Sequence, residues 1–291
     1  MARAPTIKAP DPHPIKPKFK APPLSCDAHT HIFGPDAKYP YAADASYIPH
    51  DCGLEMFNWL HESIGIERAV IVNASCHGLD NRPVTDAIAV SNGRYKGVGN
   101  VDDTFTEKQI DELDKGGVHG CRFTFLKRLG RTPDMSAFHR VVDKIKAFGW
   151  HVVIYLDPET VADFAPILSA LPVDYVIDHM GTVKASAGLD QPNFNALLDL
   201  ARRDEKCWVK VTGLERASAS GPPFHDAVPF GTKLIDTIPD RVLWGTDWPH
   251  PNVAVMPNDG ELVDLIPLMT QDPVKQHKML VDNPARLYRF K

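Results

Sequence analysis

Eight short runs of mostly apolar residues recur along this chain, and stretches of helical composition separate them. The runs cover residues 24–29, 69–74, 97–101, 120–125, 152–156, 175–178, 208–212 and 242–245. Several are nearly continuous in apolar residues, which is typical of strands buried on both faces. Strands that alternate with helices form a parallel sheet, and eight of them can close into a barrel of ~250 residues. The sequence therefore predicts an α/β fold, a single (β/α)8 TIM barrel over residues 24–291.

A doubly wound open sheet is the alternative, but no GxGxxG loop follows the first run. Polar and ionisable residues follow the first, second, fourth, fifth, sixth and eighth runs. In a barrel the carboxyl ends of all strands meet on one face, where active sites lie. The long irregular segment 32–52 follows the first run, and loops of this length are usually functional. We expect this segment to cover the site.

The first 23 residues are rich in proline and lysine and lack the apolar core of a signal peptide. We interpret residues 1–23 as an extended arm that packs on the surface or on a second subunit, so a homo-oligomer is an open option. A disordered tail is the alternative.

Composition excludes several classes of function. The formal net charge is −5 without a basic block, which argues against a nucleic-acid partner. No stretch approaches the ~18 apolar residues of a membrane span. The five cysteines are odd in number and form no CxxC pair, which disfavours a disulfide framework. Reduced thiols indicate a cytoplasmic protein, and we expect Cys26, Cys121 and Cys207 to be small core residues.

The strongest local signal is an HxH pair at the end of the first run. Alternate residues of a strand face the same way, so His29 and His31 can address one point. His179 follows the sixth run and Asp247 follows the eighth. Four such residues at three buried strand ends are hard to explain as packing, because buried charge is costly unless it is paired. They suit either one divalent metal or direct hydrogen bonds to a substrate.

Longer phrases make a family resemblance specific. They read SCHG at 75–78, RFTFLKRL at 122–129, WHVVIYLD at 150–157, VIDHMG at 176–181 and WGTDWPHPN at 244–252. Together with the HxH pair they resemble one branch of the amidohydrolase superfamily, the 2-pyrone-4,6-dicarboxylate lactonases and sulfomuconolactone hydrolases. The resemblance runs from about Cys26 to Tyr288.

The resemblance implies roles for individual residues. His29, His31 and His179 would surround a lactone, and Asp247 would activate water. The residues that would line the pocket and hold carboxylates are Tyr47, Ser75, His77, Arg122, Arg128, Tyr155 and Arg216. Two positions depart from the pyrone lactonase pattern. The pattern has Asn where this chain has Thr124, and Arg where this chain has Thr182. Loss of an arginine could change which anionic group is accepted.

The chemistry of ring opening supports Asp247 as the base, since an ionised carboxylate can take a proton from water. His250 lies in the same turn and could orient Asp247 or contact substrate. The cofactor is either none or one zinc ion, which His29, His31, His179 and Asp247 would bind. The fourth run lacks an internal lysine, and Lys127 falls beyond it, so a binuclear centre is disfavoured.

Arginine side chains at the fourth strand indicate an anionic substrate, because a guanidinium matches a carboxylate or sulfonate with two hydrogen bonds. Arg122 and Arg128 are the candidates. The leading hypothesis is a hydrolase that opens a small anionic lactone, best represented by 2-pyrone-4,6-dicarboxylate. The alternatives are a sulfomuconolactone hydrolase with one zinc ion, or a metal-dependent decarboxylase of aromatic acids.

Overall fold

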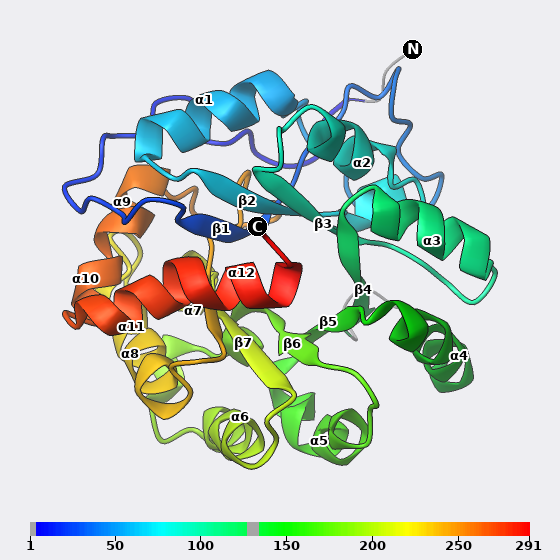
Figure 1. The fold of residues 1–291 in the computed structure, drawn as a ribbon. Helices are drawn as coiled ribbons and strands as arrows, with labels where there is room; N and C mark the ends of the chain where they lie inside the picture. Colours follow the sequence, from blue (N-terminus) through cyan, green and yellow to red (C-terminus); the bar gives the residue numbers. More distant parts are fainter. Residues whose placement is uncertain (1–3, 127–133) are drawn as a thin grey trace.

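Eight parallel strands form a barrel in this computed structural model, which describes residues 4–126 and 134–291. The strands follow one another around the barrel in chain order, as Figure 1 shows. They are β1 (Cys26–Thr30), β2 (Arg68–Val72), β3 (Tyr95–Gly99), β4 (Val118–Phe125), β5 (His151–Leu156), β6 (Tyr175–Ile177), β7 (Cys207–Val211) and β8 (Val242–Trp244). The predicted (β/α)8 barrel is confirmed, and every predicted run coincides with a strand to within two residues at each end.

The barrel closes where the chain leaves β8 and meets β1. The Asp247 amide donates to the carbonyl of His29 at 2.9 Å, and the His31 amide donates to the carbonyl of Trp248 at 2.8 Å. The amide of Thr246 also donates to the Asp27 carboxylate at 3.0 Å. These bonds hold the residues after β8 against the end of β1. Closure therefore brings together side chains that lie more than 200 residues apart in the sequence.

Helices surround the barrel and bury its outer face (Figure 1). They are α1 (Leu54–Ile64), α2 (Arg82–Ala89), α3 (Glu107–Lys115), α4 (Met135–Ile145), α5 (Val161–Ser169), α6 (Pro192–Arg203), α7 (Leu214–Ala217), α8 (Val228–Thr237), α9 (Asp259–Asp264), α10 (Ile266–Met269), α11 (Pro273–His277) and α12 (Asn283–Tyr288). In α4 the buried residues are Phe138, Val141, Val142 and Ile145. This spacing places them on one helical face against the strands.

The amino-terminal end of the barrel is closed by the carboxyl-terminal helix. Tyr288 of α12 is completely buried, and its carbonyl accepts a hydrogen bond from His119 Nδ1 at 2.9 Å. At the very end of the chain, the Lys291 carbonyl accepts a bond from Arg68 at the start of β2. Figure 1 shows α12 lying across this end. The opposite end, where the strands have their carboxyl termini, is therefore the place for a site.

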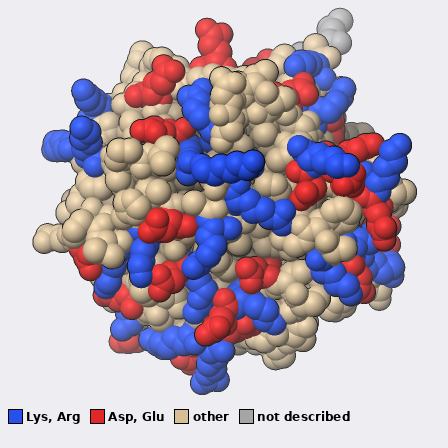
Figure 2. All heavy atoms as spheres, in the orientation of Figure 1, with Lys and Arg blue, Asp and Glu red and all other residues tan. Residues whose placement is uncertain are grey.

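Residues 4–23 run along the outside of the barrel without forming a helix or strand. The amide of Ile15 donates to Asn258 at 3.0 Å, and the amides of Lys18 and Phe19 donate to Asp264 at 2.7 and 2.8 Å. The segment thus contacts both ends of α9. Acidic and basic side chains are intermingled on the face shown in Figure 2.

The five cysteines are all buried and free. Within the described part of the chain, no helix combines the length and apolar character needed to cross a membrane.

Candidate active site

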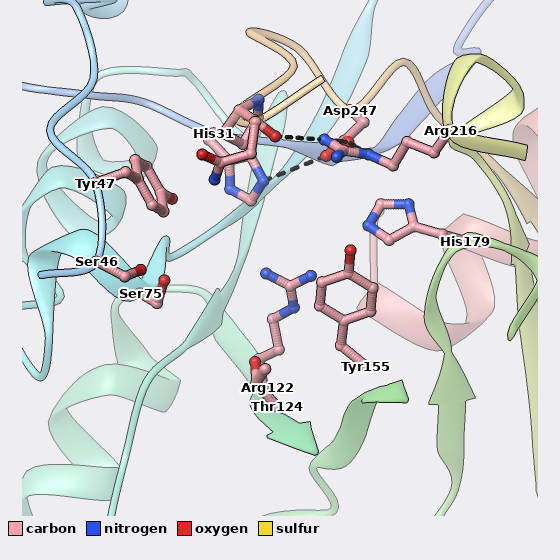
Figure 3. Close-up of a pocket in the computed structure, with 12 residues that line it drawn as sticks. His31, Ser46, Tyr47, Ser75, Arg122, Thr124, Tyr155, His179, Arg216 and Asp247 are labelled. Carbon is pink, nitrogen blue, oxygen red and sulfur yellow. Dashed lines mark hydrogen bonds and ion pairs between the residues drawn. The ribbon is translucent and has the colours of Figure 1, made fainter. Parts of the chain in front are cut away.

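A cavity opens at the carboxyl ends of the strands, and Figure 3 shows the side chains that point into it. Most of the residues predicted for the site line it together: His31, Tyr47, Ser75, Arg122, Tyr155, His179, Arg216 and Asp247. Four other residues of the lining were not selected from the sequence, namely Ser46, Thr124, Pro251 and Asn252. Thr124 was noted only as a departure from the family pattern. Barrel closure explains why residues that follow different strands converge here.

Three of the predicted residues, His29, His77 and His250, are absent from the lining of this cavity. His29 is completely buried, with its ring 4.7 Å from that of His179. His77 packs its ring against Tyr41 at 4.9 Å, and burial lowers its pKa to about 4. His250 Nε2 lies 3.0 Å from Asp259, so this histidine faces α9. Arg128 and Lys127 fall outside the described residues.

The carboxylate of Asp247 has two different oxygens. Oδ2 accepts two hydrogen bonds from Arg216, at 2.7 and 2.5 Å. Oδ1 faces the Nε2 atoms of His29 and His31, at 3.6 and 3.4 Å. Burial alone would raise the pKa of this carboxyl group, but Arg216 and the neighbouring histidines hold it well below its usual range. Asp247 is therefore an ionised base with one oxygen free of Arg216.

The backbone at Asp247 and His179 is unusual. Asp247 has φ of 70° and His179 has φ of 50°, both in the left-handed region that residues other than glycine rarely adopt. Such conformations cluster at active sites because the surrounding structure must hold them. They turn both side chains back toward the barrel mouth immediately after their strands.

His31 and His179 each use Nδ1 for a contact that fixes the ring. His31 Nδ1 donates to the Val72 carbonyl at 2.7 Å, because a carbonyl can only accept. His179 Nδ1 lies 2.8 Å from the hydroxyl of Thr212. Both contacts leave Nε2 directed toward the cavity. Burial lowers the pKa of His179 to about 4, so its ring is neutral at pH 7.

Two charged residues below the cavity were not selected from the sequence. Asp178 and Lys210 are completely buried, and Lys210 Nζ lies 3.3 Å from Asp178 Oδ1. Arg122 Nε donates to Asp178 Oδ2 at 2.8 Å. Burial works against the charge of Asp178, but Lys210, His29 and Arg122 hold its pKa well below the usual range. A lysine inside the apolar run CWVKV was the signal that could have revealed this group.

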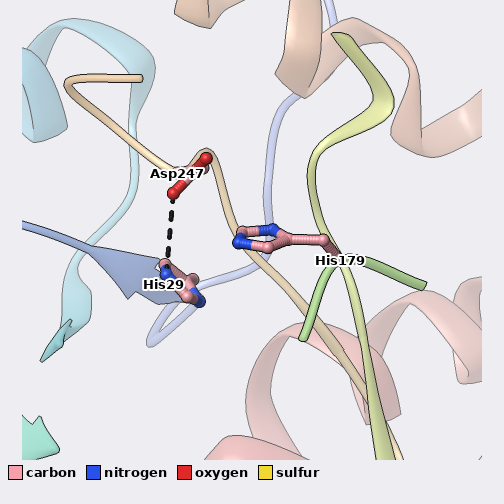
Figure 4. A group of neighbouring side chains, drawn as sticks. All are labelled: His29, His179 and Asp247. Atoms are coloured by element: carbon pink, nitrogen blue, oxygen red, sulfur yellow. Dashed lines mark ion pairs between the residues drawn. The ribbon is translucent and has the colours of Figure 1, made fainter. Parts of the chain in front are cut away.

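One group of side chains has the geometry to hold a metal ion. His29, His179 and Asp247 each offer one ligand atom, and these atoms lie within 4.8 Å of one another. Figure 4 shows them converging from β1, the segment after β6 and the segment after β8. Two cations lie beside this group: Arg216 on Asp247 and Lys210 on His29, whose Nδ1 is 3.1 Å from Nζ.

The segment 32–52 contributes directly to the cavity through Ser46 and Tyr47. Its ends are held together by Phe33 and Cys52, whose backbone groups exchange two hydrogen bonds of 3.0 and 2.8 Å. Tyr47 is buried, and its pKa lies well above the usual value because of that burial. It is therefore a neutral hydroxyl at the cavity wall.

A second cavity adjoins the first. The two share Tyr155, His179, Arg216 and Asn252. Thr182 and Lys184 line only the second one. The hydroxyl of Thr182 donates to the Leu156 carbonyl at 2.8 Å, and Lys184 Nζ donates to the Arg216 carbonyl at 3.0 Å. The Thr182 departure thus falls in this neighbouring space.

Comparison with known proteins gives a consistent picture. The model of the amidohydrolase family matches residues 26–290. A 2-pyrone-4,6-dicarboxylate hydrolase from Comamonas testosteroni is 40% identical, covering 95% of this chain and 93% of its own. A 4-sulfomuconolactone hydrolase from Hydrogenophaga intermedia is also 40% identical, covering 95% and 92%. The crystal structure of a putative 2-pyrone-4,6-dicarboxylic acid hydrolase from Pseudomonas putida superimposes with a TM-score of 0.79 at 28% identity, over 92% of this chain and 98% of its own.

Proposed function

This chain belongs to the amidohydrolase family, and from that premise we propose that it hydrolyses the ring ester of a small anionic lactone. The observation that carries the proposal is the state of Asp247. Its carboxylate is ionised, Arg216 holds one of its oxygens, and the other faces two histidines at the cavity. A base in this position can deprotonate a water molecule beside a bound ester.

The reaction then follows from the residues. Asp247 Oδ1 accepts a proton from water while the water oxygen attacks the lactone carbonyl carbon. His179 Nε2 points into the cavity and supplies a hydrogen bond to the developing oxyanion (Figure 3). When the ring C–O bond breaks, Asp247 returns the proton to the leaving oxygen. One water is consumed, and an open-chain acid is formed.

Recognition of the substrate's acid group falls mainly to Arg122. Among the described residues its guanidinium makes one hydrogen bond, from Nε to Asp178, so the terminal nitrogens can meet a carboxylate. Its guanidinium carbon lies 4.9 Å from the centre of the Tyr155 ring, which orients it toward the cavity. Ser75 and Tyr47 supply hydroxyl groups elsewhere in the lining of the same cavity. Arg128 stays a predicted substrate ligand. His77 and His250 would influence the substrate only indirectly, because they contact Tyr41 and Asp259.

The donor set fits a divalent metal by distance but not by charge. A metal would add two positive charges next to Lys210 and Arg216, each of which already contacts one of the three ligands. Repulsion between like charges at such distances is strong inside a protein. We therefore propose that the histidines and Asp247 act without a metal.

The substrate we propose is 2-pyrone-4,6-dicarboxylate, which carries two acid groups and a ring ester. A sulfonated muconolactone is the second candidate, because a relative with that activity in its name is equally identical to this chain. Thr182 supports this second candidate, because it replaces the arginine of the pyrone lactonase pattern in the lining of the adjoining cavity. The two relatives at 40% identity are named as hydrolases of a pyrone and of a sulfomuconolactone, which favours ring opening over decarboxylation.

The test is the initial rate of ring opening of 2-pyrone-4,6-dicarboxylate, followed by loss of its ultraviolet absorbance with and without a chelator. Rapid turnover that the chelator leaves unchanged is expected. If this lactone is inert, the same assay with a sulfonated muconolactone and added zinc tests the second candidate. Release of carbon dioxide instead of ring opening would contradict both.

We also propose a cytoplasmic location and a division into an arm, residues 1–23, and a barrel, residues 24–291. The contacts of Ile15, Lys18 and Phe19 with the α9 region support an arm that packs on its own barrel. Limited proteolysis would test the division, because an ordered arm resists cleavage.

A further inference from the structure

Lys210 is a completely buried lysine of β7. Only β8 separates its strand from β1 where the barrel closes. An ammonium group in such a place is costly unless it is fully paired. Its partners among the described residues are Asp178 Oδ1 at 3.3 Å and His29 Nδ1 at 3.1 Å. No step of the proposed reaction uses this lysine directly. Its contact with His29 nevertheless has a chemical consequence.

The contact decides which nitrogen of His29 carries the proton. An ammonium group has three donors and no acceptor, so a hydrogen bond with it requires a bare Nδ1. Asp178 Oδ1 lies 3.2 Å from the same Nδ1 and could in principle accept a proton from it. The geometry does not support that bond: Oδ1 is within ion-pair distance of both Nδ1 and the Lys210 ammonium, but it accepts no well-aligned hydrogen bond from a described residue. A neutral His29 with a bare Nδ1 must carry its hydrogen on Nε2.

We propose that Lys210 is a positioning residue that holds His29 in the Nε2–H tautomer and thereby keeps zinc affinity low. In this tautomer the Nε2–H group points at Asp247 Oδ1, 3.6 Å away. At this distance the contact is electrostatic rather than a hydrogen bond, and it stabilises the negative charge on the oxygen that Arg216 leaves free. The catalytic value of this contact rests on the proposed function, but the tautomer itself does not.

Metal binding needs the opposite tautomer. A histidine ligand coordinates through a bare nitrogen and usually donates its other N–H to a carboxylate or carbonyl. Here that would require Nδ1–H directed at Asp178 and a bare Nε2 directed at Asp247. With Lys210 in place, the Nδ1–H would point at an ammonium group. Arg122 reinforces this arrangement, because it occupies Asp178 Oδ2.

Nitrogen-15 NMR of histidine-labelled protein tests the tautomer without any substrate. The His29 signals, assigned by their loss in His29→Gln, are expected to show a protonated Nε2 and a bare Nδ1. In Lys210→Met, which removes the donor but keeps the length, the proton is expected to move to Nδ1. Lys233→Met on α8 is the matched control and should leave the signals unchanged. A bare Nε2 in the unaltered protein overturns the proposal even if Lys210→Met fails to fold.

Zinc binding gives the second readout, measured by competition with a fluorescent chelator. Lys210→Met is expected to bind zinc on the order of 10- to 100-fold more tightly than the unaltered protein and the Lys233→Met control. Equal affinities in all three proteins would overturn the link between Lys210 and metal exclusion. Both measurements can give the expected result even when the protein hydrolyses no lactone. Failure of the proposed function can therefore be told apart from failure of the Lys210 proposal.

Discussion

Replacement of Arg216 distinguishes two roles for this side chain. The family resemblance implies that it holds a substrate carboxylate, whereas the structure places it on the catalytic carboxylate. Its guanidinium donates two hydrogen bonds to Asp247 Oδ2 and a third to the Pro251 carbonyl at 2.8 Å. A side chain so engaged has little left for substrate. We therefore expect Arg216→Gln to affect kcat far more than KM.

The magnitude follows from the ion pair that this substitution breaks. Breaking a buried ion pair costs about 3–5 kcal/mol, because the remaining charge is left without a partner. For Asp247 the main remaining influence is burial, which raises the pKa of the carboxyl group. A base misplaced by about 1 Å costs on the order of 100-fold in rate. We thus expect kcat to fall by about 100-fold or more, and the free energy of unfolding to fall by about 3 kcal/mol.

The pH dependence of kcat/KM gives a second, independent test of the role of Arg216. In the unaltered protein the pKa of Asp247 lies well below its usual range, so the base is ionised throughout the neutral and mildly acidic region. In Arg216→Gln the carboxyl group would bind its proton at a higher pH. The acidic limb of kcat/KM should therefore move upward, and activity at pH 5 should fall more than activity at pH 8.

Steady-state assays from pH 4.5 to 9 would measure these effects. Arg216→Lys retains the positive charge but cannot donate the two parallel hydrogen bonds to Asp247, and it should recover part of kcat. Arg202→Gln on α6, whose partner Asp199 is half exposed, is the control for loss of an arginine elsewhere. If Arg216→Gln raised KM steeply and left kcat and the acidic limb unchanged, Arg216 would be a substrate ligand and the reasoning would fail.

Three further predictions test the remaining parts of the site. Asp247→Asn should lower kcat by about 100- to 10,000-fold while calorimetry still detects substrate binding; a near-normal rate would remove Asp247 as the base. Arg122→Met should lower kcat/KM for a dianionic lactone by about 10-fold or more, because a charge-assisted bond is lost; an unchanged value would place Arg122 outside recognition. Stability should fall in acid, since His77 and His179 have folded pKa values of about 4 against an unfolded value of ~6.5. The unfolded chain binds these protons first, so the stability present above pH 6.5 declines toward pH 4, by about 2 kcal/mol per histidine at pH 5; urea denaturation that gave equal stability at pH 7 and pH 5 would contradict this.

The fold was predictable from the sequence because most strands are buried on both faces, and several of them are nearly continuous in apolar residues. The candidate residues could be grouped for the same reason: barrel closure places everything that follows a strand at one end. His29, His31, His179 and Asp247 therefore come together as expected. What the pattern could not give is the direction in which a side chain turns after its strand.

His77 and His250 illustrate that limit. Both follow strands, yet His77 turns into the aromatic cluster of Tyr41 and Phe33, and His250 turns toward Asp259. These directions depend on backbone torsions such as the positive φ of 59° at His250, which no spacing rule specifies. Lys210 was missed for another reason. Within an apolar strand a single lysine has no visible partner until the strands close and bring Asp178 beside it.

The pairing of Arg216 with Asp247 changes where an anionic substrate can be held. If Arg216 belongs to the base, Arg122 is the cation of the main cavity with terminal nitrogens to spare among the described residues. One arginine accounts for one acid group. A second acid group must then reach toward the adjoining cavity, where Lys184 lies and where Thr182 replaces the arginine of the pyrone lactonase pattern. Substrates that differ only in this second group, carboxylate against sulfonate, should therefore be discriminated by residues of the adjoining cavity. A Thr182→Arg variant should accordingly shift the ratio of kcat/KM values between the two lactones toward the dicarboxylate, and an unchanged ratio would place the second acid group elsewhere.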